Sequence, residues 1–333
     1  MKILIIHTAF LGDVVLITPL IKGTKKLFPD SKIDVLVIPQ TQEVLKQNPH
    51  INEILVFDKR KHKVINFIKT LSKLRKKQYD IALLPHSSMT TSFLVFFSHI
   101  KKRIGFDRWL SSVLLTHKIP FKKGVHRIEK NLDLLSPFSE IQFNIQTELF
   151  PDTEDFEKAD SLLSELDPVK KKIAFAPGSV WYTKRWPETY YRQLAQKLVE
   201  SGFSIVLVGS PQEKELCERI MPVNNAITVA GNTTVLESAA VLKKCDLLIS
   251  NDCGALHIAN AMETDVFAIF GPTVKKFGFY PFRENDKIFE LDIACRPCSL
   301  HGGKKCPRGH HNCMKLIKPE KVLQEMNELF NKK

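Results

Sequence analysis

Short runs of β-branched and aliphatic residues alternate with stretches of helical periodicity along this chain of 333 residues. The runs form two series, residues 2–7, 33–38, 54–57 and 80–84 in the first half, and residues 173–176, 204–208, 226–229, 247–250 and 266–270 in the second. Strands that alternate with helices are typical of a parallel, doubly wound α/β sheet. The pattern therefore predicts an α/β protein with two Rossmann-like halves.

A chain of this length fits about two domains. We expect an N-terminal domain over residues 1–165 and a C-terminal domain over residues 171–318. Residues 319–333 are expected to form a terminal helix, with Pro319 in its first turn. Pro19 lies inside the first helical stretch, where we expect it to kink or shorten the helix.

Positive charge is concentrated in the first half. Between Lys59 and Lys130 there are 18 Lys and Arg residues and three acidic residues, so this segment carries +15 and the rest of the +13 chain is slightly acidic. Any one basic cluster is equally well explained as a solvated helix face. The asymmetry as a whole favours a surface that meets a polyanion, such as nucleic acid, a phosphorylated lipid or an anionic bilayer.

The apolar runs and the N-terminal residues bear on the cellular location of the protein. Apolar runs such as residues 93–97 are far shorter than the roughly 18 residues of a spanning helix. The start lacks the long apolar stretch and small-residue cleavage site of a signal peptide. We therefore expect a cytoplasmic protein.

The turn after the first apolar run presents an acid. A dinucleotide-binding turn carries a glycine-rich fingerprint, whereas this turn has only Gly12, followed by Asp13. At the start of a helix, Asp13 is expected to stay ionised. The missing fingerprint disfavours a dinucleotide-dependent oxidoreductase.

Three turns of the second half are suited to an anion or a nucleotide. The first contains Ser179, Thr183 and Lys184, and the second has Glu213 in a polar turn after a strand. The third, from Asn251 to Gly254, joins a buried strand to a helix whose first N–H groups favour an anion. Each residue also has a structural explanation: Asp252 as an N-cap, Glu213 as a first-turn acid, His257 and Trp186 as core residues.

The order of four segments resembles a known family. These segments are "GDVVLITPLI", "APGSVWYTKRWP", "GSPQEKE" and "SNDCGALHIANAMETDVFAIFGPT". Together they are similar to the lipopolysaccharide heptosyltransferases of glycosyltransferase family 9. The resemblance implies the GT-B fold, with two Rossmann-like domains facing across a cleft: an acceptor-binding N-terminal domain and a donor-binding C-terminal domain.

The resemblance also implies a reaction, in which heptose moves from ADP-heptose to a heptose or Kdo sugar of the lipid A-linked inner core, with inversion. Asp13 would be the general base. The donor would be bound by residues of the second half: Ser179, Thr183, Lys184, Glu213, Asp252, Cys253, Gly254, His257, Gly271 and Thr273. Cys253 stands where family members often have Ser or Thr.

We expect the acceptor to be bound by Gly12 and by three arginines of the basic segment, Arg60, Arg103 and Arg127. The acceptor would be held in the cytoplasmic face of the bacterial inner membrane, with peripheral contact between the basic half and anionic lipid. No Asp-x-Asp pair accompanies the proposed diphosphate site, so no metal cofactor is expected for catalysis.

The segment "CRPCSLHGGKKCPRGHHNCM" is similar to a cysteine-rich segment of the heptosyltransferase II branch. Its cysteines are Cys295, Cys298, Cys306 and Cys313, and three histidines lie among them. A structural zinc site, disulfides and free thiols all remain possible from the spacing.

Two other functions compete with this one. A nucleic-acid-binding protein would explain the basic segment but not the second half, and it predicts stacking aromatics or a recognition helix that the segment does not clearly show. A nucleotide-sugar epimerase, or another ADP- or GDP-sugar transferase with a GT-B fold, is the nearer alternative, although an epimerase needs no basic acceptor surface.

Overall fold

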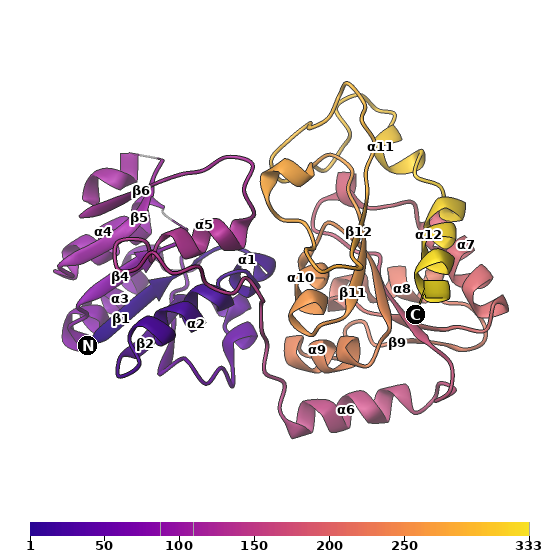
Figure 1. Ribbon diagram of the computed structural model, residues 1–333, viewed down its shortest axis with the longest axis horizontal. Coiled ribbons are helices and arrows are strands. Elements are labelled where there is room, and N and C mark those ends of the chain that lie inside the picture. The colour runs from indigo at the N-terminus through magenta and orange to yellow at the C-terminus, as the bar shows by residue number, and fades with distance from the viewer. Residues whose placement is uncertain (87, 109, 333) are drawn as a thin grey trace. The chain divides into compact units, whose positions relative to one another are not determined.

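The computed structural model describes residues 1–86, 88–108 and 110–332 (Figure 1). The chain divides into two compact units, Met1–Phe150 and Pro151–Lys333. Each unit contains one six-stranded parallel sheet with helices on its faces. The α/β prediction and the GT-B class of two Rossmann-like domains are therefore confirmed.

The first sheet has the strand order β3-β2-β1-β4-β5-β6, which is the Rossmann order. Its strands are β1 (Lys2–Ile6), β2 (Lys32–Val37), β3 (Glu53–Val56), β4 (Ile81–Leu84), β5 (Lys102–Asp107) and β6 (His117–Pro120). The helices of this unit are α1 (Leu11–Val15), α2 (Thr18–Leu27), α3 (Lys63–Lys77), α4 (Met89–Phe97) and α5 (Arg127–Asp133), with 3-10 turns η1 (Pro39–Thr41), η2 (Glu43–Leu45) and η3 (Leu110–Leu114).

The second sheet repeats this topology in the order β12-β11-β10-β7-β8-β9. Its strands are β7 (Lys172–Ala176), β8 (Ser204–Leu207), β9 (Ala226–Thr228), β10 (Leu247–Asn251), β11 (Asp265–Ile269) and β12 (Lys287–Phe289). The helices are α6 (Thr153–Leu163), α7 (Glu188–Glu200), α8 (Lys214–Ile220), α9 (Val235–Lys243), α10 (Gly254–Ala261), α11 (Asn312–Lys315) and α12 (Pro319–Lys332), with η4 (Tyr182–Lys184), η5 (Pro211–Glu213) and η6 (Lys275–Phe277).

The boundary between the units lies after Phe150, not after residue 165. Helix α6 begins three residues after this boundary and packs against α9 of the second unit. Lys244 forms an ion pair with Asp160 at 2.6 Å and lies over the ring of Phe156. These contacts place α6 in the second unit.

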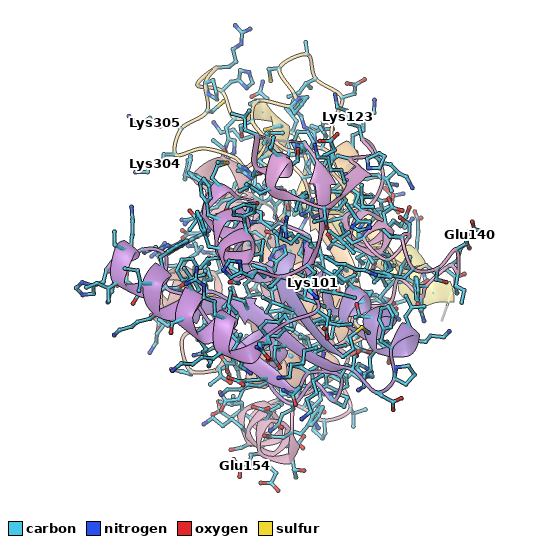
Figure 2. The ribbon with its side chains drawn as sticks, turned by 90° about the vertical axis from the view of Figure 1, so that its left-hand side faces the viewer. Lys101, Lys123, Glu140, Glu154, Lys304 and Lys305 are labelled. Carbon is cyan, nitrogen blue, oxygen red and sulfur yellow. The ribbon has the colours of Figure 1, made fainter. Side chains whose placement is uncertain are left out.

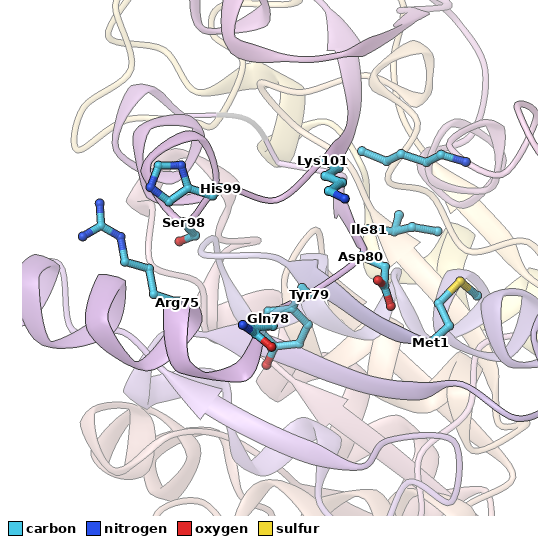
Figure 3. A pocket seen from close by; sticks show the side chains of 10 residues that line it. Met1, Arg75, Gln78, Tyr79, Asp80, Ile81, Ser98, His99 and Lys101 are labelled. Atoms are coloured by element: carbon cyan, nitrogen blue, oxygen red, sulfur yellow. The ribbon is translucent and has the colours of Figure 1, made fainter.

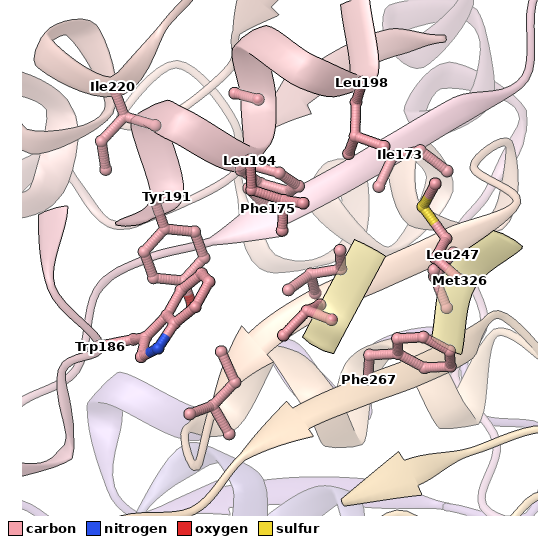
Figure 4. Close-up of a cluster of buried hydrophobic side chains, with 14 of the residues drawn as sticks. Ile173, Phe175, Trp186, Tyr191, Leu194, Leu198, Ile220, Leu247, Phe267 and Met326 are labelled. Atoms are coloured by element: carbon pink, nitrogen blue, oxygen red, sulfur yellow. The ribbon is translucent and has the colours of Figure 1, made fainter. Parts of the chain in front are cut away.

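The terminal helix is part of the second core. Val322 and Met326 of α12 are fully buried in the same cluster as Phe175, Tyr191 and other residues of the sheet and α7 (Figure 4). Trp186 belongs to this cluster and donates its indole N–H to the carbonyl of Ile317 at 2.8 Å. The interpretation of Trp186 as a packing residue is therefore confirmed.

The first helical stretch is divided in two at Pro19. α1 ends at Val15, and α2 begins at Thr18 with Pro19 in its first turn, where the missing N–H costs no helical hydrogen bond. None of the helices within the described ranges is long and apolar enough to cross a membrane.

Candidate active site

The predicted anion-binding turns of the second unit meet where β7 and β10 end. These neighbouring strands continue to opposite sides of the sheet, so the carboxyl ends of β7 and β10 form its topological switch point. Ligands of open α/β sheets bind at this position.

Lys184 and Asp252 form an ion pair at the switch point. The Lys184 Nζ lies 2.6 Å from Oδ2 of Asp252, and the two side chains are only 13% and 9% exposed. The hydroxyl of Thr273, which follows β11, donates to the same carboxylate oxygen at 2.6 Å. Asp252 therefore joins three turns and holds the lysine in one place.

Helix α10 begins directly after this ion pair. Cys253 is its N-cap residue, Gly254 its first residue, and His257 is buried one turn later. Burial raises the pKa of the Cys253 thiol to about 11, so this group is a neutral thiol near pH 7. The N-terminal end of the α10 dipole favours negative charge here.

The Glu213 carboxylate reaches back to the turn after β7. A Cβ atom on Gly178 would lie 1.9 Å from Oε1 of Glu213, so only glycine leaves room for this carboxylate. The backbone N–H and hydroxyl of Ser210 both donate to Oε2, at 2.9 and 2.8 Å. Glu213 is thereby fixed beside Gly178.

Asn251, the last residue of β10, ties these turns together. Its amide donates to the carbonyls of Pro177 and Gly178 at 2.7 and 3.3 Å, and its oxygen accepts the N–H of Trp186 at 2.9 Å. The side chain is fully buried. Asn251 therefore sets the path of the β7 turn that carries Lys184.

Other predicted donor residues have structural partners. The Thr183 hydroxyl accepts the N–H of Gly303 at 2.8 Å, and the Ser179 hydroxyl accepts the N–H of Trp181 at 3.4 Å. A Cβ atom on Gly271 would lie 2.5 Å from the sulfur of Met314. In this structure these three residues shape the site, and both hydroxyls are already hydrogen-bonded.

The first unit has a second group of polar residues at its own switch point, where β1 and β4 end. Gly12 is buried in α1, and Asp13 lies in the first turn of this helix. Arg127, at the start of α5, donates to the carbonyl of Pro85 at 2.6 Å. Burial lowers the pKa of Arg127, and the nearby Asp13 carboxylate opposes that shift. Asp13 and Arg127 are therefore electrostatically coupled.

Two histidines accompany these residues. His7 follows β1 and is fully buried, and His86 follows β4, with 5.7 Å between the ring centroids. Burial, assisted by the positive charges of Lys59 and Arg127, lowers the pKa of His86 to about 4 and lowers that of His7 well below its usual value. Both rings are neutral at pH 7, while Lys59 donates to the carbonyl of Thr8 at 2.6 Å.

The predicted acceptor arginines do not all lie together. Arg60 is exposed in the loop after β3, at the same edge of the sheet as Asp13. Arg103 lies near the start of β5, at the opposite edge, because the strands are parallel. It donates to the carbonyls of Leu114 and Ile100 at 2.7 and 2.6 Å. The structure therefore does not bring Arg103 to Asp13.

A family model described as "Glycosyltransferase family 9 (heptosyltransferase)" matches residues 67–306. The chain belongs to glycosyltransferase family 9. It is accordingly a glycosyltransferase, and the family match does not support an epimerase.

Relatives of this glycosyltransferase match over its whole length. The lipooligosaccharide heptosyltransferase 2 of Haemophilus influenzae is 26% identical, with 100% of both chains covered. The solved family 9 glycosyltransferase of Veillonella parvula is 22% identical with a TM-score of 0.90, covering 100% of this chain and 98% of that one. The solved ADP-heptose lipopolysaccharide heptosyltransferase II of Escherichia coli is 23% identical with a TM-score of 0.82, covering 100% and 99%.

The cysteine-rich segment of this glycosyltransferase carries free thiols. None of the seven cysteines forms a disulfide in this structure. Cys298, Cys306 and Cys313 line a cavity of about 40 Å³ beside Thr183 and His311. Among the residues that the structure describes, no group of three His, Cys, Asp or Glu side chains is arranged to hold a metal ion. The zinc alternative, with Cys295 as the fourth ligand, therefore has no preformed ligand set.

Sequence reasoning missed several residues of these two groups. His7, His86 and Lys59 all follow strands of the first sheet, so their position at strand ends was the available signal. Asn251 is a polar residue at the end of a buried strand, which is a similar signal. Arg296 donates to the carbonyl of Thr273 at 2.7 Å. It lies in a segment without helix or strand, so the sequence offered no signal that points to it.

Proposed function

We propose that this glycosyltransferase is a heptosyltransferase of lipopolysaccharide core assembly. In this proposal it moves heptose from ADP-heptose to a heptose or Kdo sugar of the lipid A-linked inner core, with inversion. The observation that carries the proposal is the Lys184–Asp252 ion pair at the switch point, held by Thr273 and next to the start of α10. The names of the Haemophilus and Escherichia relatives support the choice of sugar, donor and acceptor.

The donor diphosphate would bind between Lys184 and the N-terminal end of α10. A lysine and a helix N-terminus both stabilise the negative charge that develops on ADP as it leaves. These groups supply positive charge at the diphosphate. We therefore propose that heptose transfer needs no metal ion. The Glu213 carboxylate, fixed beside Gly178, would accept hydrogen bonds from the adenosine ribose.

Asp13 would act as the general base. The acceptor hydroxyl gives its proton to the Asp13 carboxylate while its oxygen forms a bond to the anomeric carbon of heptose. The bond from that carbon to the ADP oxygen breaks on the opposite side, and its electron pair leaves with ADP. General-base assistance of this kind contributes roughly 10²- to 10⁴-fold in rate.

The acceptor would meet a positively charged edge of the first sheet. Arg127 lies near Asp13, and Arg127 and Lys59 both lie near His7 and His86. Their charges suit the carboxylate of a Kdo sugar or a phosphate of the core. We also propose that the enzyme works at the cytoplasmic face of the inner membrane in peripheral contact with anionic lipid. Nucleic acid is not a partner in this proposal.

Calorimetric titration of the full-length protein with ADP, UDP, GDP and NAD⁺ tests the donor assignment. We expect ADP to bind more tightly than the other three, and we expect this binding to weaken in Asp252→Ala. Preference for UDP would contradict an ADP-sugar donor. An ADP affinity that is unchanged in Asp252→Ala would remove this residue from the donor site.

A further inference from the structure

Three elements of the first unit form one continuous surface layer. α3 packs beside α4, and α4 packs beside η3. Leu74 of α3, Leu94 and Val95 of α4, and Leu115, which directly follows η3, lie in one hydrophobic cluster with β1, β2 and β4. Because the inner sides of these elements cover the same face of the sheet, their outer sides form one surface, which we call the outer face.

Helix α4 presents large apolar side chains on the outer face. Met89, Phe93, Phe96 and Phe97 stand at positions i, i+4, i+7 and i+8, so they share one side of the helix, and each is 36–47% exposed. Phe93 stacks on Phe97 at 5.9 Å, and Phe96 meets Phe97 edge-on at 5.4 Å. A nine-residue helix thus carries an aromatic stripe on the side away from the core.

The apolar surface continues onto the neighbouring elements. Ile65 and Ile68 of α3 are 53% and 59% exposed, and Leu110 and Val113 of η3 are 85% and 72% exposed. Single exposed apolar residues are common, but contiguous exposed patches mark binding surfaces.

Positive charge surrounds this patch. Helix α3 contains six Lys or Arg residues and no acidic residue, and Lys69 and Lys76 are exposed on it. Beyond the ends of α3 and α4 lies an open hollow of about 1000 Å³, lined by Arg75, His99 and Lys101 among others (Figure 3). Figure 2 views the molecule from the side on which Lys101 lies.

The hollow adjoins the aromatic stripe. Arg75 donates to the carbonyl of Phe97 at 2.8 Å, so the last turn of α4 and the cations of the hollow are in direct contact. Asp80, which also lines the hollow, accepts the backbone N–H of Lys2 at 2.7 Å. The hollow is therefore predominantly cationic.

We propose that the outer face docks onto an anionic lipid bilayer. Its aromatic and aliphatic side chains would enter the boundary between headgroups and acyl chains, and the lysines and arginines would lie among the lipid phosphates, with the hollow receiving headgroups. An apolar face bordered by basic residues is the arrangement that binds such interfaces. The proposed function supplies the claims that the bilayer is the inner membrane and that it carries the acceptor, and the inference adds the surface that makes the contact.

The charge of the outer face favours a membrane over a second copy of the chain. Two copies meeting through this surface would bring the α3 lysines of both together, whereas an anionic bilayer neutralises them. Nucleic acid would also suit the charge, and the phenylalanine rings of α4 would suit base stacking. However, Ile65, Ile68, Leu110 and Val113 offer no ring for base stacking, and they suit the hydrocarbon boundary better.

The outer face also leads toward the candidate acceptor site. α4 begins at Met89, three residues after His86, which lies at the carboxyl edge of the first sheet with His7. The aromatic stripe therefore begins near this edge and runs along α4 away from it. A lipid-anchored acceptor would leave the bilayer beside the residues proposed to bind it.

Co-sedimentation with sucrose-loaded vesicles tests this docking. The full-length protein is mixed with vesicles of phosphatidylcholine alone or of phosphatidylcholine with an equal amount of phosphatidylglycerol. The test variants are Phe93→Ser with Phe97→Ser, and Lys69→Glu with Lys76→Glu. The matched controls in the second unit are Val169→Ser with Val223→Ser, both at least 90% exposed, and Lys158→Glu with Lys214→Glu, both exposed lysines.

We expect the protein to bind the anionic vesicles, to bind phosphatidylcholine much more weakly, and to lose affinity as salt rises. Each test variant should lower the partition coefficient at least about tenfold, and the controls should change it little. Equal binding to both vesicle types, or equal losses in test and control variants, would overturn the proposal. A dimer or a nucleic-acid complex that depends on these residues, without vesicle binding, would also overturn it.

Transfer to a deacylated, water-soluble acceptor, measured in parallel, separates this inference from the proposed function. The docking variants should keep that activity, because their substitutions lie outside the site. Vesicle binding without any transfer would remove the proposed function and leave the docking surface. Normal transfer without vesicle binding would remove the docking surface and leave the proposed function.

Discussion

The Lys184 Nζ lies 2.6 Å from Oδ2 of Asp252, which joins the turn after β7 to the turn after β10. Both side chains are largely shielded from water, and Thr273 donates to the same carboxylate oxygen. An ion pair in such surroundings is much less weakened by solvent than one on the surface. The carboxylate therefore holds the lysine in position before any anion binds.

Lys184→Ala should weaken ADP binding. Loss of a charged hydrogen bond to a phosphate is expected to raise the Kd at least about tenfold, measured by isothermal titration calorimetry. Lys158→Ala, an exposed lysine of α6, is the control and should leave the Kd unchanged. An unaltered Kd for Lys184→Ala would remove the lysine from the phosphate site.

Asn251→Ala should destabilise the second unit. The substitution removes two donated hydrogen bonds and leaves the buried N–H of Trp186 without its partner, which should cost about 2 to 3 kcal/mol of unfolding free energy. Chemical denaturation measures the change, with the exposed Asn232→Ala as control. A loss no larger than that of the control would mean that Asn251 does not hold the β7 turn.

Stability should fall as the pH drops from about 6.5 toward 4. The pKa of His86 is lowered to about 4 in the folded protein, so between these values the unfolded chain binds a proton that the folded chain does not. Protonation therefore favours unfolding, by up to about 3 kcal/mol for this group. In His86→Gln the fall in unfolding free energy over this range should be smaller. Identical pH profiles would contradict the assignment of a neutral, partly buried His86.

Cysteine reactivity should differ sharply along the chain. Burial tends to raise the pKa of Cys306, but backbone N–H groups from Arg308 to His311 outweigh it and lower the pKa. Burial raises the pKa of Cys217 and Cys245 to about 12. Because the thiolate is the reactive form, iodoacetamide at pH 8 should modify Cys306 well before these two. Peptide mass spectrometry gives the order, and faster labelling of Cys217 or Cys245 in the folded protein would contradict it.

Much of the fold follows from apolar runs because most central strands are buried on both faces and contain few polar residues. β5, β6 and β12 were missed. β6 and β12 lie at sheet edges, and only Ile119 and Phe289 in them are buried. β5 lies inside its sheet, but its buried run is only three residues long and is bounded by charged residues. The sequence of α6 does not say which unit this helix packs on. That choice depends on α9, to which α6 is not adjacent in the chain.

The candidate site was predictable where residues follow strands and unpredictable where side chains form specific bonds. Lys184, Glu213 and Asp252 were placed at the correct edge by strand ends alone. Nothing in the sequence indicates that the backbone N–H of Gly303 donates a hydrogen bond to the Thr183 hydroxyl. Arg103 was chosen from the basic composition of its segment, which carries no information on the edge of the sheet at which a residue lies.

The most direct test of the account is transfer of heptose from ADP-heptose to a deacylated inner-core acceptor, followed by mass spectrometry of the acceptor and by ADP release. The wild-type protein should add one heptose. Asp13→Asn should reduce turnover by at least about a hundredfold while keeping its affinity for ADP. No heptosylated product from the wild type would contradict the proposed function, and near-normal turnover by Asp13→Asn would contradict the role of Asp13 as general base.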